Sequence, residues 1–164
     1  AAAEAGIVKG YEGGAFKPNK SVTRAEFLAM LAIGLKLSGE EASLSGFSDA
    51  GDAGAWAIPA LSQAVKAGIL HGYADGTLRP NEELSRAQLA VLLSNALGQA
   101  AESNGAEAAG FADASRIPAW AADAVARVHA QGLMKGTTGN RFEPEGIVTR
   151  AEAAAVVVRL IQSF

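Results

Sequence analysis

The chain has 164 residues, of which 49% are hydrophobic and 19% are charged, and its formal net charge is −3. These values exclude a disordered tail and a basic nucleic-acid-binding surface, and the apolar runs are too short to cross a bilayer. Because the chain has no cysteine, disulfides and thiol chemistry are also excluded, and the length predicts one globular domain with an alanine-rich core.

The chain begins with AAAEAGIVKG, which is typical of the last turns of a helix that ends at Gly6. This segment has no basic region followed by an apolar stretch, so it is not a signal peptide. We therefore expect the chain to start within a mature or trimmed protein, inside a helix whose beginning is missing.

From Gly6 onward one pattern is written three times. The segments GIVKGYEGGAFKPNKSVTRAE, GILHGYADGTLRPNEELSRAQ and GLMKGTTGNRFEPEGIVTRAE align without a gap. A second block, with F-x-D followed by W, precedes the later two copies only. The pattern predicts one domain of three repeats, the first truncated at its start. The expected repeats cover about 1–40, 46–100 and 110–164.

Each repeat is predicted to form a helix, a loop and a second helix. The first helix starts near Trp56 or Trp120 and ends at a glycine, and the loop combines a glycine turn with a short extended piece that ends in proline. Apolar residues at steps of three and four mark the second helix. Since a lone unit cannot bury its apolar face, we expect a mostly helical, closed pseudo-threefold bundle.

The second helix of every repeat begins with Thr or Ser, Arg, Ala, and then Glu or Gln. This spacing predicts a capping box, in which the first and fourth side chains bond each other's backbone N–H groups. The helix-capping residues are expected to be Thr23, Glu26, Ser85, Gln88, Thr149 and Glu152.

The capping box does not explain the arginine that follows its first residue, at Arg24, Arg86 and Arg150. A cation there opposes the helix dipole. Two explanations stay open: a carboxylate within the fold, or an anionic ligand outside it that also uses exposed N–H groups at the helix start.

Other polar and aromatic residues carry weaker signals. The two histidines lack metal-ligand partners at a suitable spacing, and no calcium loop, nucleophile arrangement or recurring acid–base pair is present, so no metal, cofactor or enzymatic activity is expected. Trp56 and Trp120 are interpreted as core anchors, with a sugar platform at a groove edge as the alternative. Asp49 and Asp113 are interpreted as helix caps or Asx-turn residues.

Taken together, F-x-D with W-A, G-I-x-x-G-Y-x-D-G-T-x-x-P and [TS]-R-A-[EQ], in that order, resemble the S-layer homology domain over nearly the whole chain. The resemblance implies a central three-helix bundle with three projecting lobes. It also implies a secreted, non-catalytic module that anchors proteins to the bacterial cell wall or S-layer. The implied partner is secondary cell-wall polysaccharide, an anionic glycan with pyruvate-ketal N-acetylmannosamine, bound in grooves between repeats.

The resemblance also suggests which residues form the glycan sites. One groove would use Arg24 with Gly10, Tyr11, Phe47, Asp49 and Gly51, and a second would use Arg86 with Gly72, Tyr73, Phe111, Asp113 and Ser115. Arg150 has no following repeat, so its groove is expected to be weak or empty. The alternative function is a helical scaffold that makes lattice contacts with other surface proteins and binds no glycan.

Overall fold

The computed structural model describes residue 6 and residues 16–39, 42–98 and 110–164. This part of the chain contains five α-helices, two 3-10 turns and isolated β-bridges, with no strand. The mostly helical fold predicted from the sequence is confirmed. The helix expected before Gly6 falls on residues 1–5, which lie outside the described residues.

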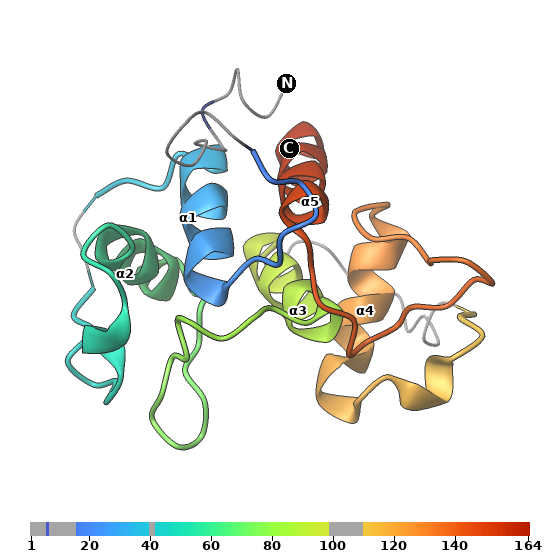
Figure 1. Cartoon of the computed structure of the whole chain (residues 1–164), viewed down its shortest axis with the longest axis horizontal. Coiled ribbons are helices and arrows are strands. Elements are labelled where there is room, and N and C mark those ends of the chain that lie inside the picture. Colours follow the sequence, from blue (N-terminus) through green and yellow to red (C-terminus); the bar gives the residue numbers. More distant parts are fainter. Residues whose placement is uncertain (1–5, 7–15, 40–41, 99–109) are drawn as a thin grey trace.

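The helices pack as a central group with one helix added on each side (Figure 1). Their bounds are α1 (Arg24–Gly34), α2 (Ile58–Lys66), α3 (Arg86–Ala96), α4 (Ala119–Ala130) and α5 (Arg150–Gln162), with the 3-10 turns η1 (Ala50–Asp52) and η2 (Ala114–Arg116). Helices α1, α3 and α5 lie in the middle of the molecule, α2 packs on α1, and α4 packs on α3.

The three central helices begin with the capping boxes that the sequence predicts. The Thr23 hydroxyl accepts a hydrogen bond from the Glu26 N–H, and the Glu26 carboxylate accepts one from the Thr23 N–H. Ser85 with Gln88 and Thr149 with Glu152 repeat this arrangement. Each box therefore satisfies two backbone donors at the start of its helix.

The three repeats are joined by a closed ring of backbone hydrogen bonds just before these helices. Val22 N–H donates to Val148 O at 3.0 Å, Leu84 N–H donates to Val22 O at 3.0 Å, and Val148 N–H donates to Leu84 O at 2.8 Å. The three residues are completely buried. The ring connects the last repeat back to the first, as expected for a closed pseudo-threefold bundle.

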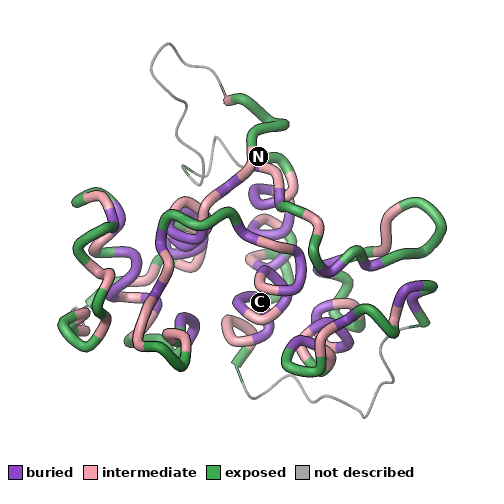
Figure 2. The backbone as a smooth tube through the Cα atoms, turned by 60° about the horizontal axis from the view of Figure 1, so that its bottom comes forward, coloured by how far each residue is buried: buried purple, intermediate pink, exposed green. Residues whose placement is uncertain are grey.

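The core is built mainly from Leu, Val and Ala residues. Figure 2 shows buried residues along the helices, while exposed residues gather on the outer loops. Helix α1 comes so close to α5 that a Cβ atom added to Gly34 would lie 2.7 Å from a methyl group of Val157. The interpretation of Trp56 and Trp120 as core anchors is wrong, because each is 62% exposed. The inward positions of α2 and α4 are taken by smaller residues such as Leu61 instead.

The ring predicts that losing one of its N–H groups destabilises the whole bundle. Val22→Pro removes a buried donor that the fold uses, whereas Val22→Ala shortens the same side chain and keeps the N–H. We expect Val22→Pro to lower the free energy of unfolding by about 2 kcal/mol or more beyond the loss in Val22→Ala. Urea denaturation of both variants measures this difference, and equal losses would contradict a structural role for the ring.

Candidate ligand-binding grooves

The arginines at the helix starts are buried and bind the neighbouring repeat through Nε. Arg24, Arg86 and Arg150 are only 4%, 9% and 5% exposed. Their Nε–H groups donate to the backbone carbonyls of Leu78 at 3.0 Å, Phe142 at 2.7 Å and Phe16 at 3.1 Å, respectively. The sequence suggested either a carboxylate or an anionic ligand as the partner, and a backbone carbonyl is neither. The Nε–H group of each arginine therefore has a structural role.

The Arg150 contact shows that the first repeat follows the third one around the ring. Phe16 belongs to the first repeat, and the backbone N–H groups of Arg150 and Ala151 donate to Lys20 O and Pro18 O of that same repeat. The interpretation that Arg150 has no following repeat is therefore wrong, because the ring places the first repeat after the third.

The backbone at the helix starts is not available to a ligand in the way that the sequence suggested. Arg24 N–H donates to Glu82 O at 3.0 Å, and Ala25 N–H donates to Pro80 O at 2.9 Å. The corresponding N–H groups of α3 and α5 also donate to carbonyls of the next repeat. Any anion that binds here must therefore use side-chain donors.

The aspartates of the F-x-D blocks hold the same extended pieces from the other side. Asp49 accepts from the N–H groups of Leu78 at 2.7 Å and Arg79 at 2.8 Å. Asp113 accepts from Phe142 N–H at 2.7 Å and Glu143 N–H at 2.9 Å. Their interpretation as helix caps is wrong, because neither side chain bonds the 3-10 turn that follows it. They fix backbone that lies about thirty residues away in sequence.

The phenylalanines of these blocks pack on the glycine loop of their own repeat. A Cβ atom on Gly72 would lie only 2.4 Å from the Phe47 ring, and one on Gly136 would lie 3.2 Å from the Phe111 ring. The structure thus places Phe47 with the loop at Gly72, whereas the sequence analysis grouped it with Gly10 and Tyr11. Gly10 and Tyr11 lie outside the described residues.

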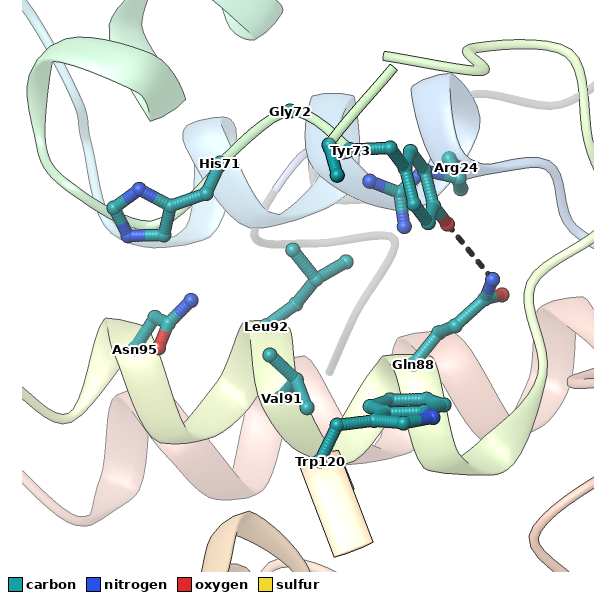
Figure 3. Close-up of a pocket in the computed structure, with 10 residues that line it drawn as sticks. Arg24, His71, Gly72, Tyr73, Gln88, Val91, Leu92, Asn95 and Trp120 are labelled. Carbon is teal, nitrogen blue, oxygen red and sulfur yellow. Dashed lines mark hydrogen bonds between the residues drawn. The ribbon is translucent and has the colours of Figure 1, made fainter. Parts of the chain in front are cut away.

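Beside Arg24 the repeats form an open groove, called here the Arg24 groove, with a volume of about 400 Å³ (Figure 3). It is lined by Arg24, His71, Gly72, Tyr73, Ala74, Gln88, Val91, Leu92, Asn95 and Trp120. The Arg24 guanidinium lies 4.9 Å from the centre of the Tyr73 ring. The groove combines Arg24 of the first repeat with Tyr73 of the second and Trp120 of the third, a grouping that the sequence analysis missed.

The charge of Arg24 has no carboxylate partner on the described lining of this groove. Burial lowers the pKa of Arg24, and the attraction of Tyr73 and Glu82 offsets part of this effect. An arginine nevertheless stays protonated at neutral pH. Only its Nε takes part in a hydrogen bond with the described residues. The terminal nitrogens are therefore charged donors that face a partly apolar groove.

An equivalent groove beside Arg86, the Arg86 groove, has a volume of about 370 Å³ and different chemistry. Its lining consists of Arg86, Leu89, Met134, Lys135, Gly136, Thr137, Ala151, Glu152, Ala155, Val156 and Arg159. One terminal nitrogen of Arg86 donates to Lys135 O at 2.9 Å, and the other lies 3.7 Å from the Glu152 carboxylate. Thr137 takes the place of Tyr73, and the lining residues that the structure describes include no aromatic side chain.

A third hollow of about 440 Å³ lies between α1 and α2. Trp56 lines it together with residues of α1, just as Trp120 lines the Arg24 groove together with residues of α3. Its lining also includes Ile33, Lys36 and Pro59. The two remaining expected site residues, Gly51 and Ser115, are exposed in η1 and η2 and line none of these three cavities.

Within the described residues, no group of three or more His, Cys, Asp or Glu side chains could hold a metal ion. In the same part of the chain, every helix is too short or too polar to pass through a lipid bilayer.

Comparison with known proteins gives a consistent set of similarities. The family model described as the S-layer homology domain matches residues 1–28, 46–90 and 110–154. The chain is 39% identical over 160 residues to "Exoglucanase XynX" of Acetivibrio thermocellus, which covers 95% of this chain and 14% of that protein. It is 32% identical to the "S-layer protein" of Bacillus thuringiensis subsp. finitimus, over 98% of this chain and 19% of that protein.

A "Cellulosome-anchoring protein" of Acetivibrio thermocellus is 29% identical over 95% of this chain and 35% of its own length. The chain therefore spans a minor part of the relatives that it matches. What these proteins share with it is a region of about 160 residues.

The Asp113 clamp predicts a specific loss of stability in acid. Burial raises the pKa of Asp113, but the N–H groups of Phe142 and Glu143 outweigh it and hold this pKa below its ordinary value of 3.8. The stabilising contribution is thus complete above about pH 4 and is lost as the pH falls through the folded-state pKa. Asp113→Asn should lower the free energy of unfolding by about 1–3 kcal/mol at pH 7.

Denaturation between pH 2 and pH 7 measures this effect. The difference between wild type and Asp113→Asn should shrink toward pH 2, whereas Asp123→Asn, an exposed change on α4, should have little effect at any pH. A difference that stays constant with pH would show that the carboxylate charge is not what stabilises this loop.

Proposed function

The chain belongs to the S-layer homology domain family, and we propose that it holds its parent protein to the wall by binding a pyruvylated polysaccharide in the Arg24 groove. The coarser role follows from family membership: the module is a non-catalytic cell-wall anchor of secreted, surface-associated proteins. The enzyme names of some relatives belong to proteins that are much longer than this chain, and their activities are not transferred to it.

The observation that carries this proposal is the buried Arg24 guanidinium, which faces an open groove whose described lining residues include no carboxylate. A pyruvate ketal carries a carboxylate on a sugar ring. Charge-assisted hydrogen bonds from a guanidinium to such a group are among the strongest that proteins make. A planar fork of donors also matches the geometry of a carboxylate better than a lysine ammonium does.

The apolar part of the groove suits the rest of the same sugar. Val91 and Leu92 form the floor beside Gln88, and the Trp120 indole forms a wall that is mostly open to solvent (Figure 3). Aromatic faces and aliphatic side chains of this kind can contact the C–H face of a sugar, an acetyl group or a ketal methyl group. Asn95 and His71 add polar groups at the far end.

A second candidate function is a protein-binding scaffold within a surface lattice. The hollow with Trp56 and Ile33 favours it, because these side chains are 62% and 42% exposed and have apolar neighbours. Binding of the module to purified cell walls separates the two functions. A glycan anchor should lose retention when the polysaccharide is stripped from the walls, while retention on stripped walls would support the scaffold.

The nature of the anion can be tested with small saccharides. We expect calorimetric titration to detect binding of the methyl glycoside of pyruvate-ketal N-acetylmannosamine. Its carboxyl methyl ester should bind with an affinity at least about tenfold lower, because the ester cannot accept charge-assisted hydrogen bonds. A uronic acid methyl glycoside provides the second control. Equal binding of the uronic acid and the ketal would indicate a general sugar carboxylate and would contradict specificity for pyruvate.

Arg24→Lys should weaken binding of the pyruvylated glycoside by about tenfold or more, because lysine keeps the charge but loses the fork. Arg116→Lys is the matched control, since Arg116 is exposed and does not line the Arg24 groove. Its guanidinium pairs with the Glu145 carboxylate at 3.3 Å. Because Arg24 also binds Leu78 O, the free energy of unfolding is measured beside the affinity. Similar affinities of the two lysine variants would contradict the assignment of this groove.

A further inference from the structure

The Arg24 and Arg86 grooves differ at several positions, and one of them is the fourth residue of the capping box. Gln88 of α3 lies in the Arg24 groove, and Glu152 of α5 lies at the same place in the Arg86 groove. We propose that this residue decides which groove accepts a carboxylate, so that Gln88 leaves the Arg24 groove competent and Glu152 closes the Arg86 groove. The inference rests on the proposed function only for the identity of the natural ligand.

In the Arg24 groove, the capping box fixes the orientation of the Gln88 amide. Its Oε1 accepts the Ser85 N–H at 3.0 Å, so its Nε2 must point the other way and donates to the Tyr73 hydroxyl oxygen at 2.8 Å (Figure 3). An amide nitrogen has no lone pair that can accept a hydrogen bond. The Tyr73 hydroxyl therefore keeps its own proton, which is available to an acceptor in the groove.

Arg24 adds further donors next to the Tyr73 ring. Its Nε is used by Leu78 O, and its terminal nitrogens make no hydrogen bond with a described residue. The guanidinium lies 4.9 Å from the centre of the Tyr73 ring, so its terminal donors and the tyrosine ring share one end of the groove. A carboxylate, which only accepts hydrogen bonds, fits a set made entirely of donors.

In the Arg86 groove, the equivalent donors are used within the fold. Arg86 donates to Phe142 O and Lys135 O, and its remaining terminal nitrogen lies 3.7 Å from Glu152 Oε1. The Thr137 hydroxyl donates to Arg141 O at 3.1 Å. A ligand carboxylate at this point would meet the charge of Glu152 and would have to displace it from Arg86.

The total charge of the lining residues, taken alone, would favour carboxylate binding in the Arg86 groove. The Arg86 groove also contains Lys135 and Arg159, whereas His71 and Asn95 occupy these positions in the Arg24 groove. If attraction by net charge dominated, the Arg86 groove would be the better carboxylate site. The two explanations therefore predict opposite preferences, which makes the inference testable with a simple anion.

The test exchanges the two residues in the whole module, as Gln88→Glu, Glu152→Gln and the double exchange. Both residues already complete a capping box in this fold, so each variant should keep its helix start. The probe is sodium pyruvate, with sodium chloride at equal ionic strength as the reference. The readout is the NMR signal of the Nε–H groups of Arg24 and Arg86, which are buried and hydrogen-bonded.

In wild type, we expect the Arg24 signal to respond to pyruvate with an apparent affinity about tenfold higher than that of Arg86. Gln88→Glu should remove most of the Arg24 response, Glu152→Gln should raise the Arg86 response, and the double exchange should reverse the preference. Glu145→Gln removes one exposed carboxylate elsewhere and should change neither signal.

The outcomes are decisive whatever the natural glycan is. Equal responses in wild type, a stronger response of Arg86, or no response of either arginine would overturn the inference. So would an Arg24 response that survives Gln88→Glu. If the expected pattern holds but the pyruvylated glycoside does not bind, the role of Gln88 stands and the proposed ligand is wrong. If the glycoside binds but the pattern fails, the proposed ligand stands and the role of Gln88 is wrong.

Discussion

The fold depends on three buried backbone hydrogen bonds that run in a circle through Val22, Leu84 and Val148. In each repeat the N–H donates to the preceding repeat and the carbonyl accepts from the following one, so no repeat can be moved without breaking two bonds. The arginine of each repeat stands two residues after its ring residue. The ring therefore sets both where a helix starts and which neighbouring loop its arginine meets.

One backbone arrangement used three times permits different chemistry in each groove. The positions that line the Arg24 and Arg86 grooves correspond closely, and the helices that carry them begin with the same capping box. Tyr73 against Thr137, together with Gln88 against Glu152, changes which hydrogen-bond donors remain free. These differences leave the ring in place, because Gln88 and Glu152 make the same backbone bond, each accepting the N–H of the residue that follows a ring residue.

Sequence patterns predicted the features that depend on neighbours along the chain. The capping box joins residues three apart, and the apolar steps mark one face of a helix, so the central helices could be located closely. The bonds of Asp49 and Asp113 reach backbone N–H groups about thirty residues away, and a backbone donor leaves no mark in the sequence. The order of repeats also does not reveal which side of the ring an arginine faces, so the contact of Arg24 with the Tyr73 ring of the second repeat was not predicted.

The arginine at the helix start can now be explained in physical terms. The N–H groups of Arg24 and Ala25 already point at the carbonyl oxygens of Glu82 and Pro80, whose partial negative charges weaken the field that would repel a cation. Nε then holds Leu78 O, and the terminal nitrogens are left for the groove. A lysine has a single ammonium and cannot serve both directions with fixed geometry. The same fork that joins one repeat to the next thus presents a buried positive charge to the Arg24 groove.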